Sequence, residues 1–301
     1  MRENVYRIVK CNYCGSRNYK VIIKASKPVD FNKIFSTSKS VRGVQQIVKC
    51  KNCGLIYVNP QIEVRMLNRS YSKDSNLSYV DEAESRIDTF CESIKIIDKY
   101  FPQRGKILDV GAGSGFFLKV ARDEGWRTWG VELSKWLSNY ANEKYSVNIK
   151  QGTLKEAKFK DNYFDVITMW DVIEHLPNPD SELKEICRVL KPGGMLVVNY
   201  PDIGTPVARV MGSKWWFLFS THLFYFDRRL MKKLLEKNNF ENFEFKAYWQ
   251  TISWGHLAEM LGLYSVTFSK IIKRILVRLG WEKVRVRYYA GQNTVIVRKT
   301  R

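Results

Sequence analysis

Residues 106–118 of this 301-residue chain read KILDVGAGSGFFL. An apolar segment reaches Val110, glycines follow at positions 111, 113 and 115, and apolar residues then continue at helical spacing. A strand that enters a glycine turn and opens a helix lets a ligand approach the backbone closely at the helix N-terminus. The spacing is G-x-G-x-G, which departs from the G-x-G-x-x-G of dinucleotide-binding enzymes. The stretch therefore predicts a binding site for a nucleotide-like ligand at the end of a strand.

The residues after this stretch continue as alternating strands and helices. Glu132 stands at the end of a second predicted strand, where a carboxylate can accept hydrogen bonds from ribose hydroxyls. Further predicted strands cover residues 147–153, 164–171 and 195–199, with a helix before the last of them. Short turns between alternating elements predict an α/β fold with a doubly wound, mostly parallel sheet that binds its ligand at the carboxyl edge.

Four of the six cysteines form two Cys-x-x-Cys pairs, Cys11 with Cys14 and Cys50 with Cys53, and each pair is followed by glycine. Two thiolates on one tight turn can face a metal ion, and two such turns complete a tetrahedral site. We therefore expect a structural Zn²⁺ ion in a zinc-ribbon module over residues 1–60, which is too small to be stable without such support. A redox pair or unrelated thiols are the alternatives.

The formal charge of +20 is concentrated at the two ends of the chain. Residues 1–60 contain 12 Lys or Arg and 2 Asp or Glu, residues 201–301 contain 18 and 7, and the middle is nearly neutral. Such flanks suit an anionic partner, for example phosphate, nucleic acid or an acidic membrane face. No apolar run reaches the roughly 18 residues of a membrane span and no secretory signal is recognisable, so a cytoplasmic location is expected.

Four segments together resemble the successive motifs of class I S-adenosylmethionine-dependent methyltransferases, in order and in spacing. They are LDVGAGSG, GVELS, FDVITMWDVIEHL and LKPGGMLVV, within about residues 60–245. The resemblance implies a Rossmann-like fold with a seven-stranded sheet, and S-adenosylmethionine as the cofactor. The cofactor-binding residues that it implies are Asp109, Gly111, Ala112, Gly113, Gly115, Glu132, Leu133, Thr153, Leu154, Trp170 and Asp171.

In this family the glycine turn passes under the methionine moiety and the acidic strand end holds the ribose. Residues 133 and 153–154 are expected beside the adenine, and residues 170–171 would close the site. Many relatives carry an acid where this chain has Thr153, which leaves contact with the adenine amino group open. Asp109 also has a structural alternative, because such an acid can close a strand turn through hydrogen bonds to backbone amides.

The cysteine pairs point to a subgroup of this family. Zinc-module methyltransferases of this layout occur in bacterial gene clusters for surface polysaccharides and modified sugars, and residues 215–226 resemble their substrate-side insert. Some sugar C-methyltransferases among them carry a Tyr-x-Glu-His catalytic set, where this chain has Phe219, Thr221 and His222. Since only the histidine is retained, the resemblance favours O-methylation of a sugar, a glycan or another small molecule, including a phosphorylated or lipid-linked one.

Methylation of a hydroxyl requires a base for the acceptor proton, and histidine suits this task at neutral pH. His222 lies between aromatic runs that are typical of a pocket wall, with packing or helix capping as the alternative. His175 follows the predicted fourth strand, where the Glu174-His175 pair could instead position the fold. His256, within the C-terminal insert, is the weakest candidate.

The chain divides into three predicted parts. The zinc-ribbon module is followed by a helical linker and lid over residues 61–104 and by the methyltransferase domain over residues 105–301. Within that domain, predicted strands at 239–245 and 292–298 flank a basic insert at about residues 251–290. An amphipathic helical pattern in this insert can lie on the inner face of an anionic membrane or meet a partner, or it can simply cover a core.

Two functions are compatible with these features. In the first, the basic flanks meet the phosphate of a small acceptor that is methylated on oxygen. In the alternative, the chain is an RNA methyltransferase whose flanks bind the phosphate backbone. No RNA-base signature such as Asn-Pro-Pro-Tyr follows the fourth strand, where residues 171–174 read DVIE, so the small-molecule acceptor is favoured.

Overall fold

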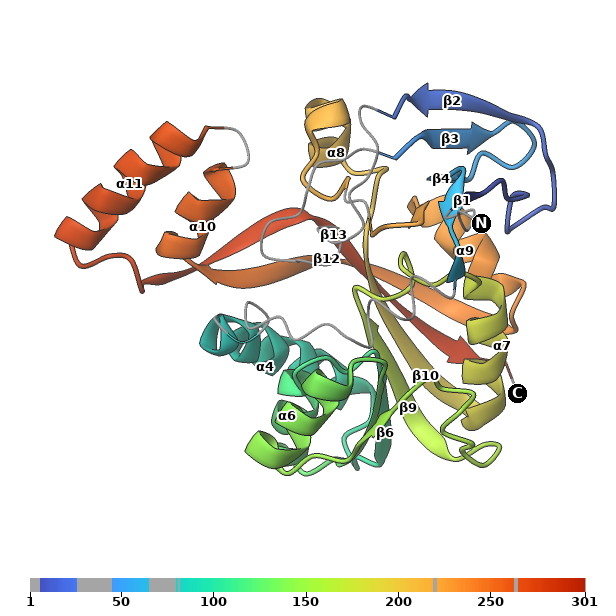
Figure 1. The fold of residues 1–301 in the computed structure, drawn as a ribbon. Coiled ribbons are helices and arrows are strands. Elements are labelled where there is room, and N and C mark those ends of the chain that lie inside the picture. Colours follow the sequence, from blue (N-terminus) through green and yellow to red (C-terminus); the bar gives the residue numbers. More distant parts are fainter. Residues whose placement is uncertain are drawn as a thin grey trace, which may run out of the picture.

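The structure is a computed structural model that describes residues 6–25, 45–64, 80, 82–218, 221–262 and 265–300. A seven-stranded sheet forms its centre (Figure 1). The strands are β6 (Lys106–Val110), β7 (Arg127–Glu132), β8 (Ile149–Gln151), β9 (Phe164–Trp170), β10 (Leu190–Pro201), β12 (Phe240–Ser253) and β13 (Arg285–Lys299). Their order is β12-β13-β10-β9-β6-β7-β8, in which β13 is antiparallel to both neighbours and the other pairings are parallel. The predicted α/β fold with a mostly parallel, seven-stranded sheet is confirmed.

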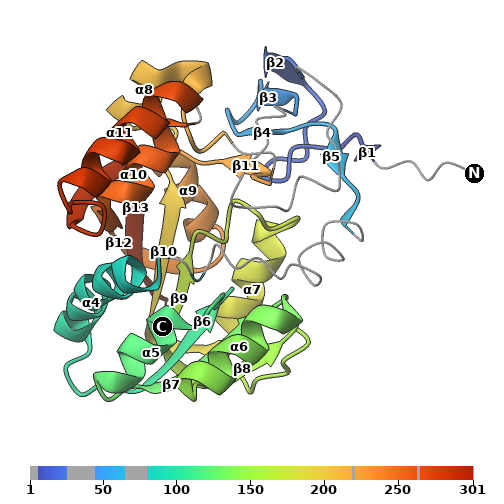
Figure 2. The same cartoon turned by 60° about the vertical axis from the view of Figure 1, so that its left-hand side comes forward.

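Helices cover both faces of this sheet (Figure 2). On one face lie α4 (Ala83–Tyr100), α5 (Phe116–Asp123) and α6 (Lys135–Tyr145), and on the other lie α7 (Pro179–Val189) and α9 (Arg228–Glu236). Successive residues of a strand point to opposite faces. Ile107 therefore joins the core beneath α4 and α5, whereas Leu108 joins the core beneath α7 and α9. The continuous apolar runs of the central strands reflect burial on both faces.

The N-terminal segment forms a second sheet that a distant part of the chain completes. Its strands are β2 (Tyr19–Ile23), β3 (Ile47–Cys50), β4 (Ile56–Val58) and β11 (Phe224–Tyr225), and β11 pairs with β4. A further pairing joins β1 (Tyr6–Arg7) to β5 (Gln61–Ile62). The start of the predicted helical linker is therefore a strand. The helix α4 forms the later part of that linker. Residues 65–79 and 81 of the linker lie outside the described residues.

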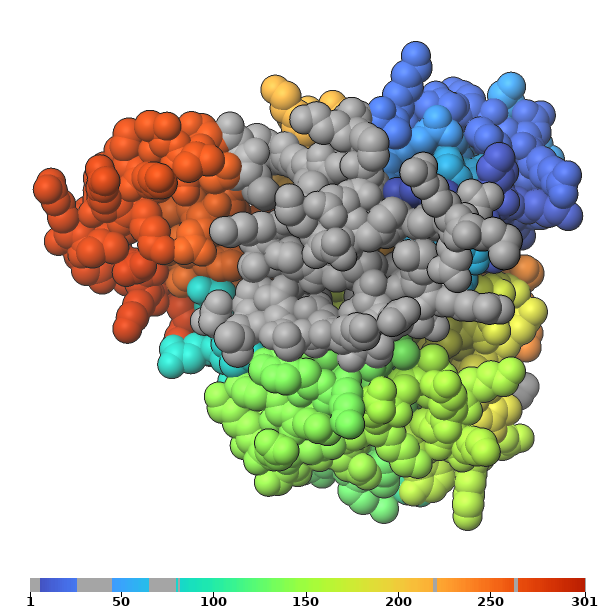
Figure 3. Space-filling view, in the orientation of Figure 1, coloured from blue at the N-terminus to red at the C-terminus, as the bar shows by residue number. Residues whose placement is uncertain are grey.

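The C-terminal hairpin is longer than the sequence pattern predicted. Both strands enter the predicted insert of residues 251–290, because β12 continues to Ser253 and β13 begins at Arg285. Aromatic residues such as Trp249 and Tyr289 pack across this hairpin and favour extended backbone. The helices α10 (Trp254–Leu261) and α11 (Val266–Arg278) form the tip of the hairpin, which stands out from the body (Figures 1 and 3). Among the described residues, no helix is both long and apolar enough to cross a membrane.

Replacement of Ile167 by alanine should lower the free energy of unfolding by about 2–5 kcal/mol, because this side chain of β9 is fully buried. The same replacement of Ile275, which is 51% exposed on α11, should change that free energy by less than about 0.5 kcal/mol. Urea unfolding followed by circular dichroism measures both values. Equal losses for the two variants would contradict the burial pattern.

Candidate functional site

The glycine turn after β6 forms an open cradle at the carboxyl edge of the sheet. Gly111, Gly113 and Gly115 have positive φ angles of 73°, 51° and 75°, which glycine adopts without steric cost. A Cβ atom on Gly111 would lie 2.6 Å from Val172 Cγ2, so the turn is tightly packed there. A Cβ atom on Gly113 would meet no atom of the described residues within 4 Å. Space for a ligand therefore lies beside Gly113, and α5 begins directly after Gly115.

The cradle is fixed to the neighbouring strand β7. The N–H groups of residues 111–112 donate to the carbonyl of Val131 at 2.9 and 3.0 Å. The Glu132 carboxylate accepts one hydrogen bond from Gly113 N–H and another from Ser134 N–H, each at 2.8 Å. The carboxylate thus lies at the mouth of the cradle, where the sequence predicts a ribose-binding group.

The loop after β8 contains a second carboxylate, that of Glu156, which was not among the predicted site residues. Glu156 accepts hydrogen bonds from the N–H and the hydroxyl of Thr153 at 2.8 and 2.9 Å. The backbone bond from Thr153 is the main reason why the pKa of Glu156 lies below its usual range. The neighbouring Leu154 is buried and Leu133 is half-buried. The Thr-x-x-Glu spacing, which is that of a helix-capping box, was the available signal for this carboxylate.

Asp109 is buried beneath the cradle. Its side chain is 2% exposed and accepts a hydrogen bond from the Thr168 hydroxyl of β9 at 2.6 Å. Burial raises the pKa of Asp109 to about 8, and the charge of Glu132 adds to this effect while the Thr168 bond opposes it. Asp109 therefore links two strands, and its contact with a cofactor stays a prediction.

Trp170, at the end of β9, points into the core beneath α4. Its ring lies 5.2 Å from that of Phe117 and stacks on Tyr248 at 5.8 Å, measured between ring centroids. It also borders a cavity between α4 and the strands β10, β12 and β13. The Trp170 indole thus lines that cavity.

Asp171 turns away from Trp170 and is held by two buried amides. It has a positive φ of 55°, and its Oδ1 accepts hydrogen bonds from Asn199 Nδ2 at 2.8 Å and Gln292 Nε2 at 2.5 Å. Burial raises the pKa of Asp171 to about 6, although the charge of Arg86 and the two amides oppose this shift. No local sequence pattern indicates these partners, because they lie on β10 and β13, far along the chain from Asp171.

The two candidate catalytic histidines lie together. The rings of His175 and His222 meet edge to face with centroids 4.6 Å apart, and His175 Nδ1 is 3.0 Å from the Thr221 carbonyl oxygen. Burial lowers the pKa of His175 to about 4 and that of His222 well below its usual range. Both imidazoles are therefore neutral near pH 7. The adjacent Glu174 is also buried.

The third histidine and one predicted neighbour lie apart from this pair. His256 is on α10, with its side chain 41% exposed and near Glu82 and Glu259. Phe219, which the sequence analysis compared with a catalytic tyrosine, lies outside the described residues.

The four predicted zinc ligands meet between the two cysteine turns. The Sγ atoms of Cys11 and Cys53 are 3.4 Å apart, and those of Cys14 and Cys50 are 3.5 Å apart. Tetrahedral Zn–S bonds of about 2.3 Å place sulfur atoms about 3.8 Å from one another. The donor set therefore fits a zinc ion after small shifts. The following glycines have positive φ angles, as the pattern predicts.

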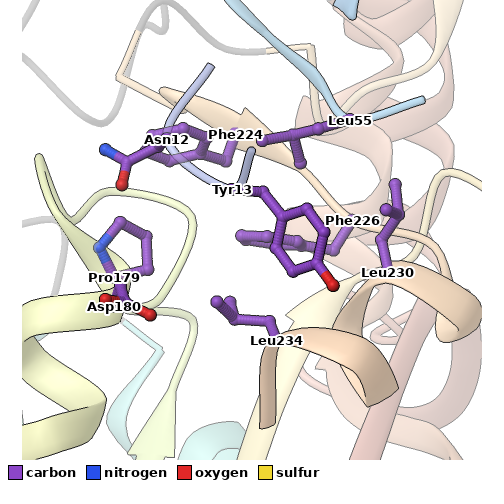
Figure 4. A pocket seen from close by; sticks show the side chains of 9 residues that line it. All are labelled: Asn12, Tyr13, Leu55, Pro179, Asp180, Phe224, Phe226, Leu230 and Leu234. Carbon is purple, nitrogen blue, oxygen red and sulfur yellow. The ribbon is translucent and has the colours of Figure 1, made fainter. Parts of the chain in front are cut away.

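A small, mostly apolar pocket lies between the N-terminal module and the main body (Figure 4). Asn12 and Tyr13 of the first cysteine turn face Pro179 at the start of α7, and Phe224 and Leu234 line the pocket as well. Asn12 Nδ2 also donates to the Pro177 carbonyl at 3.1 Å. No residue of the predicted cofactor set lines this pocket, so it marks a contact between the two parts.

Comparison with known proteins relates this site to a family. A family model described as "Methyltransferase domain" matches residues 83–244, which is more than half of the chain. A ubiquinone biosynthesis O-methyltransferase of Coxiella burnetii is 34% identical over 109 residues. The match covers 34% of this chain and 47% of that protein, so the chain spans about half the length of this curated relative.

Two solved structures are similar in fold. A SAM-dependent methyltransferase from Archaeoglobus fulgidus has a TM-score of 0.52 at 17% identity, with 74% of this chain and 100% of that chain covered. Phosphoethanolamine N-methyltransferase 2 of Haemonchus contortus, in complex with S-adenosyl-L-methionine, has a TM-score of 0.53 at 15% identity, with 94% and 69% covered. At these identities the similarity concerns the fold alone.

Asp109 should make stability depend on pH. Between about pH 4 and pH 8 the carboxyl is protonated in the folded state and ionised in the unfolded state, so unfolding releases a proton and a higher pH favours unfolding. Asp109→Asn should remove this contribution, which amounts to at most about 1.4 kcal/mol per pH unit. Urea unfolding at several pH values measures the slope. The exposed Asp161→Asn is the control, and a wild-type slope in Asp109→Asn would contradict the assignment.

Proposed function

We propose, from the premise that this chain belongs to the methyltransferase domain family, that it transfers a methyl group to a hydroxyl of a small-molecule acceptor. The family model covers residues 83–244, and the curated relatives that the chain matches in part are methyltransferases, which supports S-adenosylmethionine as the methyl donor. The acceptor that we propose is a sugar or glycan, phosphorylated or lipid-linked. The observation that carries the proposal is the open cradle at Gly113 together with a neutral histidine pair, which one turn of chain connects to the Val172 side chain that packs on the cradle.

We assign the cofactor to the cradle and its two carboxylates. When bound, S-adenosylmethionine supplies an electrophilic methyl group on a positively charged sulfur. Gly113 leaves room for it, and Glu132 is the acceptor for ribose hydroxyls, since a carboxylate can accept about four hydrogen bonds. Glu156, fixed by Thr153, takes the place of the acid that relatives carry in this loop and is proposed to accept from the adenine amino group.

We assign the acceptor to the side of the histidine pair. Val172 packs on Gly111, and its carbonyl accepts a hydrogen bond from His175 N–H at 2.9 Å, so a single turn of chain separates the pair from the cradle. The acceptor hydroxyl would give its proton to a neutral imidazole of this pair, and its oxygen would gain the methyl group as the methyl carbon–sulfur bond breaks and leaves S-adenosylhomocysteine. Fixed placement of the reacting groups can lower the activation barrier by several kcal/mol, and by about 7 kcal/mol or more where the groups are well oriented.

We propose that Cys11, Cys14, Cys50 and Cys53 hold a structural Zn²⁺ ion. The support is the close approach of the four thiols and the glycine conformation after each pair. Four thiolates leave no open coordination position, so the ion would act on folding and not on chemistry. Because β3 ends at Cys50 and β4 pairs with β11, the ion would also steady the segment that follows His222.

We further propose that the helical tip rests on an anionic lipid surface, which would bring the enzyme to a lipid-linked acceptor. The tip exposes large apolar side chains: Phe268 (54%), Ile271 (48%), Ile275 (51%), Leu279 (54%) and Trp281 (55%). The helix α11 also contains four basic residues, Lys270, Lys273, Arg274 and Arg278. Exposed apolar and basic groups together favour anionic membranes, whereas a second copy of this basic tip would be repelled.

Gly113→Ala should weaken S-adenosylmethionine binding at least about 100-fold, equivalent to about 2.7 kcal/mol, because the added Cβ fills the cradle. Gly193→Ala is the matched control, since this glycine also has a positive φ and its Cβ would meet no atom of the described residues within 4 Å. Both variants carry similar backbone strain. Isothermal titration calorimetry with S-adenosylmethionine and S-adenosylhomocysteine measures the difference, and equal binding by both variants would remove the cradle from the cofactor site.

Methyl-label transfer from S-adenosylmethionine should identify the acceptor. Wild type and Gly193→Ala should place label, as an O-methyl ether, in sugar-phosphate or lipid-linked sugar fractions of a cell extract, and Gly113→Ala should not. Label in the RNA fraction with none in the sugar fractions would overturn the proposed acceptor in favour of the RNA alternative.

Aspartate at both Phe268 and Ile275 should weaken binding to phosphatidylglycerol vesicles at least about tenfold, because it removes apolar contact and adds negative charge. The charge-matched control carries aspartate at Val21 and Val210, which are 43% and 88% exposed outside the tip. Vesicle co-sedimentation measures the binding, and phosphatidylcholine vesicles test the need for anionic lipid. Equal loss in both variants would show that net charge alone, without the tip, determines binding.

A further inference from the structure

Three polar side chains meet in the interior on the acceptor side of the cradle. Glu174 and His175 lie in the loop between β9 and α7, and His222 lies just before β11. One ligand atom from each lies within 4.8 Å of the other two. The N–H groups of residues 223 and 224 both donate to the Glu174 carbonyl, at 2.8 and 3.2 Å. The two backbone segments are thus tied together, and the three side chains are held in a fixed arrangement.

The backbone fixes which nitrogen of each ring carries a proton. Neutral His175 donates its Nδ1 proton to the Thr221 carbonyl, so its lone pair is on Nε2. His222 donates to the backbone carbonyl of Phe217, so its other ring nitrogen carries the lone pair. A histidine that ligates a metal ion characteristically donates its second ring N–H to a carbonyl or carboxylate. Both histidines are therefore oriented in the way that metal ligands are.

The carboxylate of Glu174 supplies the observation that points to a ligand. The residue is 2% exposed, and apart from its own backbone N–H neither carboxyl oxygen has a hydrogen-bond partner among the described residues. A buried carboxyl group without a partner is costly, and proteins normally pair such a group or use it to coordinate a metal. One ring nitrogen of His175 and one of His222 lie within 4.8 Å of a carboxyl oxygen of Glu174.

We propose that Glu174, His175 and His222 bind one divalent transition-metal ion. Two imidazoles and one carboxylate suit Zn²⁺, Mn²⁺, Fe²⁺ or Co²⁺ better than Ca²⁺. Bonds of about 2.0–2.2 Å place donor atoms about 3–4 Å apart, so the donor atoms, which lie within 4.8 Å of one another, need to approach by at most about 2 Å. Three protein ligands leave a position open, and an acceptor hydroxyl bound there would release its proton to water more readily. This last role rests on the proposed function, whereas metal binding itself does not.

Co²⁺ titration of the full-length protein tests the site directly. The four-cysteine site is first loaded with Zn²⁺, and weakly held metal is removed with a chelator. Co²⁺ should then bind with a stoichiometry of one, and the visible d–d bands should appear without the near-ultraviolet thiolate-to-metal absorption that a cysteine site gives. Bound Co²⁺ should also raise the thermal midpoint, since a ligand that binds the folded state stabilises it.

Glu174→Gln should weaken Co²⁺ binding at least about 100-fold and abolish the metal-induced rise in thermal midpoint. The variant keeps the shape of the side chain and removes only its ionisable group, so the metal-free protein should unfold at the wild-type temperature or above it. His222→Gln should lose the same signal. His256→Gln is the matched control, because it removes a half-exposed histidine of α10 and should bind Co²⁺ as the wild type does.

Failure to bind Co²⁺ in folded wild-type protein, or unchanged binding in folded Glu174→Gln, would overturn the proposal. If His222→Gln does not fold, Glu174→Gln alone decides. These outcomes are separate from the proposed function, because calorimetry with S-adenosylmethionine requires no metal at this cluster. A protein that binds the cofactor but not Co²⁺ would remain a methyltransferase whose histidines act without a metal.

Discussion

The Glu132 carboxylate is the link on which the proposed cofactor site depends. It accepts hydrogen bonds from the backbone on either side of the carboxyl edge, at Gly113 after β6 and at Ser134 after β7. These bonds hold the glycine turn open at Gly113, the one of its three glycines at which a Cβ atom would meet no described neighbour. The segments after β6 and β7 lie at one edge of the sheet, because these two strands are parallel neighbours. The Glu132 carboxylate then ties the two segments to each other.

The proposed acceptor side is organised by burial. Glu174 and His222 are buried, and Asp171 and His175 are half-buried. Asp171 is held by two amides and His175 by a carbonyl, from strands and loops that are distant in sequence. Desolvation disfavours the charged form of each group, which is why the pKa values of the acids rise and those of the histidines fall. Such preorganised polar groups can respond to a proton or a metal ion with little rearrangement.

The sequence predicted the elements whose signals are local. The glycine turn, the acidic end of β7 and the four thiols follow from short-range patterns, and the structure brings each set together. Glu156 was not predicted, because it lies three residues beyond the motif position of Thr153 and joins that position through a hydrogen bond from Thr153 N–H. Asn199 and Gln292 could not be predicted, because their contact with Asp171 depends on the pairing of β10 with β13. The long β12–β13 hairpin was hidden by its basic residues, which mask the strand alternation. The roles of individual site residues remain predictions.

The pairing of β11 with β4 has a consequence for regulation. The strand that closes the N-terminal sheet begins two residues after His222, and β3 of the same sheet ends at Cys50. Oxidation of the four thiols would loosen β3, which pairs with β4, and β4 in turn holds β11. The proposed methyl transfer would then respond to oxidants, and a reductant would restore it as long as the thiols had gone no further than disulfides.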